Sequence, residues 1–319
     1  MNLTDRCSSE AAECGELALT LALRHGGQVE TALRYEVAGS GDRLLLVAGG
    51  ISAGRHVAAT RACSEPGWWE AQAPTFDLDR VRLLAIDWIG ADGSIDLPID
   101  PADQADAIAA LLSHLGIART DAFVGASYGG MVALHFAARH RSRCGSILVI
   151  SASASAHPFA SACRSLQRRA LSLGDAASGV ALARAMAMLT YRTPAEFADR
   201  FAEPPRVEDG RVRVAAESYL DFQGERHAER MSATAYRRLS ESIDLHRIDP
   251  ASVAVPAAFA AVDSDALVPA PDVEALAAAV PGARYHLIHS RFGHDAFLKE
   301  EAQVATIITE FLDSLEKSA

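Results

Sequence analysis

Short apolar runs alternate with helical segments along most of this chain, and this alternation constrains the fold more than any other feature. The runs recur at 43–50, 81–88, 121–125, 146–151, 255–263 and 283–289. Continuous apolar runs of this length are typical of strands that are buried on both faces. With helical segments between them, they predict a mostly parallel central sheet that helices cover on both sides.

The clearest helix signals lie in residues 99–117. Asp100 can cap the helix, Pro101 suits its first turn, and Gly116 can close it in a left-handed conformation. The helix is therefore expected to begin at about residue 101 and to end just before Gly116.

Two parts of the chain depart from the alternation. Residues 17–24 and 30–37 read as two strands joined by a short turn, which predicts a hairpin. Residues 156–249 are rich in Arg, Ala and Met and contain no clear strand run, which predicts several helices. We therefore expect a core formed by residues 1–155 and 250–319, and a helical lid formed by 156–249 that is inserted between two strands.

The composition argues against several classes of protein. A net charge of −11 disfavours a nucleic-acid partner, because phosphate binding requires a clustered basic surface. No apolar stretch is long enough to span a bilayer, and the polar first 16 residues lack the apolar run of a secretory signal. The five cysteines form no C-x-x-C pair, so neither a disulfide framework nor a metal site is expected. We expect a cytoplasmic protein that binds no metal.

The segment VGASYGGM, residues 124–131, contains the pattern G-x-S-x-G with Ser127 at its centre. The pattern alone is weak in a chain with 22 glycines, so its context must decide. A strand is expected before it and a helix after it, which is the context of a nucleophile elbow. Ser127 is therefore the candidate nucleophile.

A serine nucleophile needs a base and an acid that orients the base, and in this architecture they follow the serine in the order acid, then histidine. Asp263 and Asp265 follow one strand, and His294 follows the next. Asp265 is preferred because it lies further out on the loop, where it can reach a neighbouring loop. His294 is the candidate base.

The oxyanion formed during acyl transfer needs backbone N–H donors. The residue after the nucleophile, Tyr128, supplies one, and the loop after strand 43–50 is expected to supply the other through Ile51.

Beyond about residue 40, the chain resembles the homoserine O-acyltransferases of the α/β-hydrolase fold. The resemblance rests on GASYGGMVALHFA around Ser127, on DSDALVP and GHDAFL at the acid and base, on GWWE ahead of the fourth strand, and on the lid segments SLQRRALSLGD, ARAMAMLTYRTPAEFADRF and ESYLDFQGERHAERMSATAYRRLSESIDLHRI. Tyr128 stands where this family usually has Met, and its ring is expected to reshape the acyl pocket. The resemblance implies ping-pong acyl transfer from acyl-CoA, which serves as a co-substrate, without any further cofactor.

The resemblance also implies the residues that bind the substrates. Arg184 and Tyr191 would hold the carboxylate of the amino acid, and Asp295 would hold its amino group. The stretch GGISAGRH replaces a more usual His-Ala-Leu-Thr run, and the loop after DWIGADG is short, as in family members that use succinyl-CoA. Arg55 would then pair with a succinyl carboxylate or face solvent. We interpret the three arginines near the entrance of the lid, Arg164, Arg168 and Arg169, as a solvated helix face. The alternative is that they attract CoA locally.

The favoured function is acyl transfer to L-homoserine in methionine biosynthesis, with succinyl-CoA preferred over acetyl-CoA as the donor. The resemblance further implies a homodimer that forms through the lid helices. Three other functions remain open. A serine O-succinyltransferase differs by one methylene in the acceptor. A serine esterase would use the same triad without an amino-acid clamp, and a non-catalytic binding module need not retain the triad.

Overall fold

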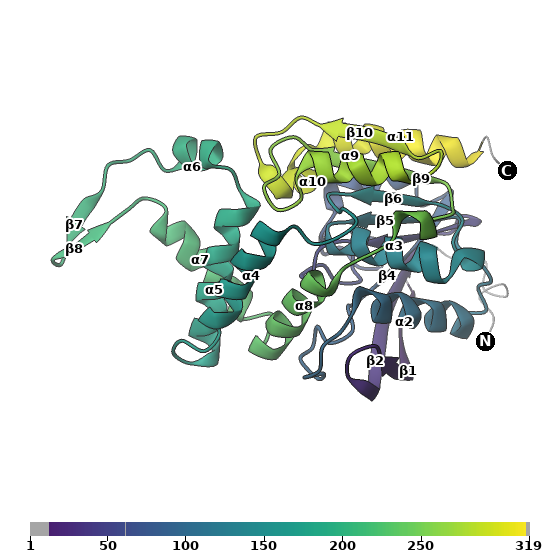
Figure 1. Cartoon of the computed structure of the whole chain (residues 1–319), viewed down its shortest axis with the longest axis horizontal. Coiled ribbons are helices and arrows are strands. Elements are labelled where there is room, and N and C mark those ends of the chain that lie inside the picture. The colour runs from purple at the N-terminus through teal and green to yellow at the C-terminus, as the bar shows by residue number, and fades with distance from the viewer. Residues whose placement is uncertain (1–12, 61, 317–319) are drawn as a thin grey trace.

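An eight-stranded sheet forms the centre of the molecule (Figure 1). The computed structural model describes residues 13–60 and 62–316, so Cys7 and the acidic start of the chain lie outside the described residues. The strands run in the order β1 (Glu13–Leu23), β2 (Gly27–Ala38), β4 (Val81–Ile86), β3 (Arg43–Ala48), β5 (Ala122–Ala126), β6 (Ile147–Ile150), β9 (Ala257–Val262) and β10 (Arg284–Ile288). β1 and β2 form the predicted hairpin, β2 also pairs antiparallel with β4, and the remaining pairs are parallel. The predicted, mostly parallel sheet is confirmed.

Helices cover both faces of this sheet. Leu44 and Leu46 of β3 belong to the apolar cluster that contains α2 (Pro101–His114), α3 (Tyr128–Arg139) and α9 (Ala270–Ala279). Leu45 and Val47, which alternate with them, pack in the cluster of α1 (Ala73–Phe76) and α11 (Glu301–Glu316). Successive strand residues point to opposite faces, so a strand buried on both must be apolar throughout.

The helix predicted at 99–117 forms as the sequence indicates. The Asp100 carboxylate accepts a hydrogen bond from the Ala102 N–H at 2.9 Å, and Pro101 is the first helical residue of α2. Gly116 has a φ of 68°, the left-handed conformation expected just beyond the end of a helix.

The chain leaves the sheet after β6 and returns to it at β9. Between them, residues 158–245, called the helical insertion below, form α4 (Pro158–Ala170), α5 (Ala176–Tyr191), α6 (Pro194–Arg200), α7 (Glu217–Ala228) and α8 (Ala233–Leu245). Helices were predicted here, but strands were not. The insertion also contains a short hairpin, β7 (Arg206–Glu208) and β8 (Arg211–Arg213), which lies at the tip of an arm on the left of Figure 1.

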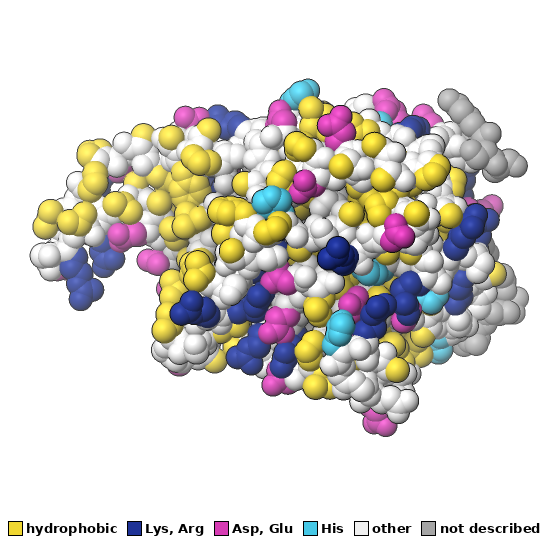
Figure 2. Space-filling view, viewed as in Figure 1, with side chains coloured by type: hydrophobic (Ala, Val, Ile, Leu, Met, Phe, Trp, Pro, Cys, Tyr) yellow, Lys and Arg dark blue, Asp and Glu magenta, His cyan; other side chains and the backbone are white. Residues whose placement is uncertain are grey.

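Apolar side chains gather on the surface of the helical insertion (Figure 2). The exposed ones include Phe159, Leu166, Leu173, Leu182, Leu189 and Phe222. Within the described part of the chain, no helix has the length and apolar character needed to cross a membrane.

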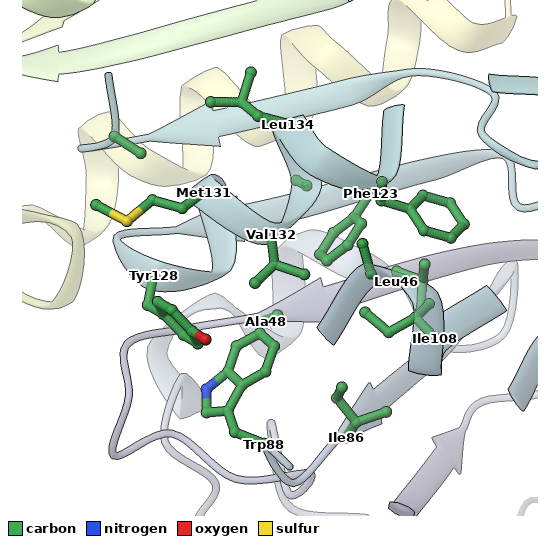
Figure 3. Packing of buried hydrophobic residues seen from close by; sticks show 14 of the residues in the cluster. Leu46, Ala48, Ile86, Trp88, Ile108, Phe123, Tyr128, Met131, Val132 and Leu134 are labelled. Atoms are coloured by element: carbon green, nitrogen blue, oxygen red, sulfur yellow. The ribbon is translucent and has the colours of Figure 1, made fainter. Parts of the chain in front are cut away.

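Beside the carboxyl ends of β3, β4 and β5, the apolar packing contains one aromatic pair (Figure 3). Trp88, which follows β4, lies with its ring centroid 4.9 Å from that of Tyr128 in an edge-to-face arrangement. Both side chains are buried, and they join the start of α3 to the loop after β4.

Candidate active site

Ser127 lies on a sharp turn between β5 and α3. Its backbone angles, φ 54° and ψ −120°, belong to a region that residues other than glycine rarely adopt. Two flanking glycines make room for the turn. A Cβ on Gly129 would lie 2.2 Å from the Ala48 carbonyl oxygen, and one on Gly125 would lie 2.3 Å from the Gly129 carbonyl oxygen. The turn has the geometry expected of a nucleophile elbow.

His294 and Asp265 continue a hydrogen-bonded chain from Ser127. The Ser127 Oγ lies 2.8 Å from the Nε2 of His294, and the Nδ1 of His294 lies 2.6 Å from the Oδ2 of Asp265. The carboxylate is only an acceptor, so the Nδ1–H donates to it and the Nε2 is left to accept the serine proton. Asp265 is itself held by the N–H groups of Leu267 and Val268, at 2.8 and 3.0 Å.

The second carboxylate that the sequence offered pairs with a different histidine. The Asp263 Oδ2 lies 2.9 Å from the Nδ1 of His289, whose side chain is 75% exposed. Asp263 and Asp265 both follow β9, and His289 and His294 both follow β10. Only Asp265 contacts the buried His294.

Burial alone would lower the pKa of His294, because it disfavours the charged imidazolium. The charge and hydrogen bond of Asp265 more than offset burial, so the pKa of His294 lies above its ordinary value. This balance suits a base that must accept and hold a proton during a reaction.

Two backbone N–H groups lie near Ser127, on Ile51 and Tyr128. Within the described residues, neither the Ile51 N–H nor the Tyr128 N–H donates a hydrogen bond. The loop of Ile51 is joined to the elbow directly, because the Gly129 N–H donates to the Gly49 carbonyl at 2.8 Å. These are the two donors that the sequence predicts for an oxyanion.

The Ser127–His294 pair opens into a cavity of about 210 Å³ between the core and the helical insertion. Its walls include Gly50, Ile51, Ser52, Trp68, Met131, Arg164, Arg184, Thr190, Tyr191, Ile243, Leu267, Asp295 and Phe297. Across residues 13–60 and 62–316, no group of three His, Cys, Asp or Glu side chains is arranged to hold a metal ion.

Comparison with known proteins identifies the family. The model of the alpha/beta hydrolase fold family matches residues 43–301. The homoserine O-succinyltransferase of Xanthomonas campestris pv. campestris is 51% identical over 314 residues, which cover 96% of this chain and 85% of that protein. This chain belongs to the homoserine O-acyltransferase family. A homoserine O-acetyltransferase of Thermus thermophilus is 32% identical and covers 89% of this chain and 86% of its own length.

The fold of the homoserine O-acyltransferase family is also found among solved structures. The homoserine O-acetyltransferase of Bacillus anthracis superposes with a TM-score of 0.85, at 16% sequence identity, and covers 95% of this chain and 98% of that one. At this identity the superposition supports the α/β-hydrolase fold alone.

Three of the four residues expected to bind substrate in a homoserine O-acyltransferase meet at the cavity. Arg184 and Tyr191 come from α5, and the Arg184 Cζ lies 5.1 Å from the centroid of the Tyr191 ring. That ring stacks on His294, with centroids 5.9 Å apart. Asp295 follows His294 directly, and burial raises the pKa of its carboxyl group, which a bound ammonium would counteract.

The structure does not bring the fourth residue, Arg55, into the cavity. The Arg55 side chain forms an ion pair with Asp87, and the Asp87 carboxylate also accepts a hydrogen bond from the Arg55 N–H at 2.8 Å. The Asp87 carboxylate, directly after β4, holds Arg55 away from the residues that line the cavity. The second cavity arginine is instead Arg164 of α4.

The Tyr128 ring does not line the cavity either. It is fully buried on the other side of the elbow, where its hydroxyl lies 2.6 Å from the Ser242 Oγ of α8. The expectation that this ring reshapes the acyl pocket is therefore wrong, and Met131, one turn later in α3, occupies the cavity wall.

Arg192 was missed by the sequence reasoning. Its Nε lies 2.9 Å from the Asp295 Oδ2, and its Nη1 lies 2.7 Å from the Glu196 Oε1. An Arg–Glu pair four residues apart was visible in TYRTPAEF, but it indicates only a helix-surface ion pair. The contact with Asp295 depends on how the insertion packs against the core.

Proposed function

We propose that this protein transfers a succinyl group from succinyl-CoA to the hydroxyl of L-homoserine, a reaction of methionine biosynthesis. The observation that carries the proposal is that Ser127, His294 and two arginines line the same cavity. The reaction joins two molecules that each bring a carboxylate, the succinyl group and the amino acid. A serine nucleophile beside two cations matches that pair of substrates.

The first half of the reaction would acylate the enzyme. His294 takes the proton of Ser127 as the Oγ attacks the thioester carbonyl, and Asp265 stabilises the imidazolium that forms. The Ile51 and Tyr128 N–H groups receive the oxyanion, an interaction worth about 3 kcal/mol per donor. The thioester C–S bond then breaks, and CoA leaves as a thiol with the proton from His294.

The second half would deliver the acyl group to the acceptor. Arg184 and Tyr191 hold the carboxylate of homoserine, and Asp295, positioned by Arg192, holds its ammonium group. His294 then takes the proton of the hydroxyl, whose oxygen attacks the acyl carbonyl. The ester bond to the Ser127 Oγ breaks, and His294 returns the proton to that oxygen. We propose that residues 156–249 act as the lid and keep water from the acyl-enzyme, because hydrolysis would otherwise compete. These steps use the side chains and backbone of this chain, with acyl-CoA as the co-substrate and no further cofactor.

Arg164 supports succinyl-CoA over acetyl-CoA as the donor. Its Nε lies 2.7 Å from the Asp244 Oδ1, and the Arg168 Nη2 lies 2.7 Å from the Oδ2 of the same carboxylate. Two guanidinium groups share one carboxylate, so the cluster carries one formal positive charge in excess. Arg164 brings that charge to the cavity wall, where a succinyl carboxylate would neutralise it and an acetyl group would not.

One assay tests the proposed function against its rivals. Purified protein is mixed with succinyl-CoA or acetyl-CoA and with homoserine or serine, while free thiol and acylated amino acid are measured. We expect O-succinylhomoserine to form fastest. Continuous thiol release without an amino acid, beyond the first equivalent that acylates Ser127, would instead indicate an esterase-like hydrolase. Faster transfer to serine would make the protein a serine O-succinyltransferase.

Replacing Ser127 with alanine supplies the control for this assay. The Ser127→Ala variant should fold normally and lose turnover by roughly 10⁶-fold, the order measured for loss of the serine of a triad. Residual thiol release at the wild-type rate would contradict the assigned nucleophile, and an inactive wild-type protein would favour a non-catalytic binding module.

We further propose that the protein acts in the cytoplasm as a homodimer that forms through the helical insertion. Its exposed apolar side chains, which Figure 2 shows gathered over the insertion, form the type of surface that subunit contacts bury. The substrates are small molecules, and neither nucleic acid nor membrane has a part in the proposed reaction.

A further inference from the structure

The indole of Trp88 holds the peptide group that carries the Ile51 N–H. The Trp88 Nε1 donates a hydrogen bond to the Gly50 carbonyl oxygen at 2.9 Å, and the Ala53 N–H donates to the same oxygen at 2.9 Å. The Gly50 carbonyl and the Ile51 N–H belong to one peptide unit. In a planar trans peptide these two bonds point in opposite directions, so fixing the carbonyl also fixes the N–H.

The hydrogen bond from Trp88 orients the Ile51 N–H in the direction that an oxyanion at Ser127 requires. Trp88 is 3% exposed and lies in the apolar packing behind the loop, whereas Gly50, Ile51 and Ser127 line the cavity. A donor that binds the Gly50 oxygen from within the protein leaves the Ile51 N–H pointing in the opposite direction within the peptide plane. A hydrogen bond to the carbonyl also polarises the peptide and strengthens its N–H as a donor.

The same indole also contacts the side chain of Tyr128, the residue whose backbone N–H is the second oxyanion donor. The Trp88 and Tyr128 rings lie edge to face (Figure 3), and their centroids are 4.9 Å apart. Tyr128 carries the other free N–H, and its hydroxyl is anchored 2.6 Å from the Ser242 Oγ in α8. One aromatic pair therefore joins both donors to each other and to the helical insertion.

We infer that Trp88 is a positioning residue for the oxyanion site: it orients the Ile51 N–H through the Gly50 carbonyl and, through the Tyr128 ring, links both donors to α8. The inference rests on the proposed function, because it assumes acyl transfer at Ser127. It also explains why the residue after the nucleophile is a tyrosine. Its ring and hydroxyl serve the scaffold of the site, while its backbone serves the reaction.

Trp88→Phe separates this role from ordinary packing. Phenylalanine keeps an aromatic ring beside Tyr128 but cannot donate to Gly50, and the Ala53 N–H still holds the loop. Outright loss of an oxyanion donor costs about 100- to 1,000-fold in rate, so a loosened donor should cost about tenfold. We expect this loss in kcat, with KM for acyl-CoA and for homoserine within about twofold, because ground-state binding does not use the oxyanion site.

The decisive measurement is the burst of thiol released by stoichiometric succinyl-CoA without an amino acid, which reports acylation of Ser127. The matched control is Trp69→Phe, because the buried Trp69 Nε1 donates to the Phe297 carbonyl at 3.0 Å and its loss removes the same type of bond. Both variants should lose similar thermal stability, but only Trp88→Phe should lower the burst rate. An unchanged burst rate in Trp88→Phe, or an equal loss in both variants, would overturn the inference.

Tyr128→Phe tests the link to α8 independently and covers the case in which Trp88→Phe does not fold. It keeps both rings and removes only the hydroxyl that bonds Ser242. The burst rate should fall at least threefold with an unchanged KM, and a wild-type rate would show that α8 has no part in positioning. If the wild-type protein releases no burst of thiol, or if Ser127→Ala gives the same burst, the proposed function itself is refuted.

Discussion

Ser127 is held in a conformation that costs free energy, and its neighbours show how the chain stabilises it. Its positive φ is worth about 1–3 kcal/mol of strain. The Ser127 N–H donates to the Ile150 carbonyl at 2.8 Å, and its carbonyl accepts hydrogen bonds from Gly130 and Met131. The strand before it and the helix after it therefore over-determine the turn and keep the Oγ exposed to the cavity.

Arg164→Gln is the residue-scale prediction for donor choice. A hydrogen-bonded charge pair contributes about 1.5–3 kcal/mol, so kcat/KM for succinyl-CoA should fall roughly 10- to 150-fold relative to that for acetyl-CoA. The measurement is the ratio of the two kcat/KM values at saturating homoserine.

Arg168→Gln is the matched control, because Arg168 shares Asp244 but does not line the cavity. Arg168→Gln removes the excess charge of the cluster but leaves the Arg164 guanidinium on the cavity wall, so its donor ratio should fall less than that of Arg164→Gln. If Arg164→Gln lowered both donors equally, or raised only the KM for homoserine, Arg164 would not recognise the succinyl group.

Residue positions differ in how far the sequence could predict them. Ser127 follows β5 directly, and Asp265 and His294 lie on the loops after β9 and β10, so local pattern and chain order sufficed to predict them. The environment of Arg55 and the direction of the Tyr128 ring depend on distant partners, Asp87 and Ser242, the latter 114 residues away. No local pattern records such contacts.

At the scale of elements, α2 and α3 are joined at one end by a charged cluster. The Asp106 carboxylate of α2 accepts hydrogen bonds from Arg139 at 2.6 and 2.9 Å and lies 2.7 Å from the His140 Nε2. Burial alone would raise the pKa of Asp106, but the His140 and Arg139 hydrogen bonds more than offset it and lower the pKa to about 2. The ordinary value of 3.8 holds in the unfolded chain.

Asp106→Asn should therefore destabilise the protein in a pH-dependent way. The folded-state pKa is depressed, so the stabilisation is fully present above about pH 4 and is lost as the pH falls toward about 2. We expect a loss of about 1–2 kcal/mol in the free energy of unfolding at pH 7. Urea unfolding at pH 7 and pH 3 should show the difference from wild type shrinking with acid.

Glu203→Gln provides the comparison, because its ion pair with Arg206 lies on the surface. It should change the free energy of unfolding by no more than about 0.5 kcal/mol. An Asp106→Asn deficit that stays constant down to pH 3 would contradict the charge-based explanation.

Elements also differ in what their sequences reveal. The central strands β3, β5, β6 and β9 and the helix α2 carry strong patterns because burial and capping fix nearly every position. The hairpin of β7 and β8 has only three residues per strand, all of them exposed, and so leaves no periodic signal.

For the whole molecule, the proposed homodimer gives a direct prediction. Leu182→Glu combined with Phe222→Glu places two charges among the exposed apolar side chains of the insertion and should convert the dimer to a monomer. Light scattering of purified protein gives the mass in solution. Leu287→Glu, an exposed position on β10 outside the insertion, should leave the mass unchanged. A wild-type protein with the mass of one chain would refute the dimer.

The position of the insertion also matters while the chain is being made. Residues 151–256 separate β6 from β9, its neighbour in the finished sheet. At roughly 5–20 residues per second, a ribosome needs about 5–20 s to synthesise that interval. During this time the fully apolar β6 presents an unpaired edge, which invites pairing with another nascent chain. We therefore expect the insertion to make the growing polypeptide more prone to aggregation, and its yield in cells to rise when chaperones are co-expressed.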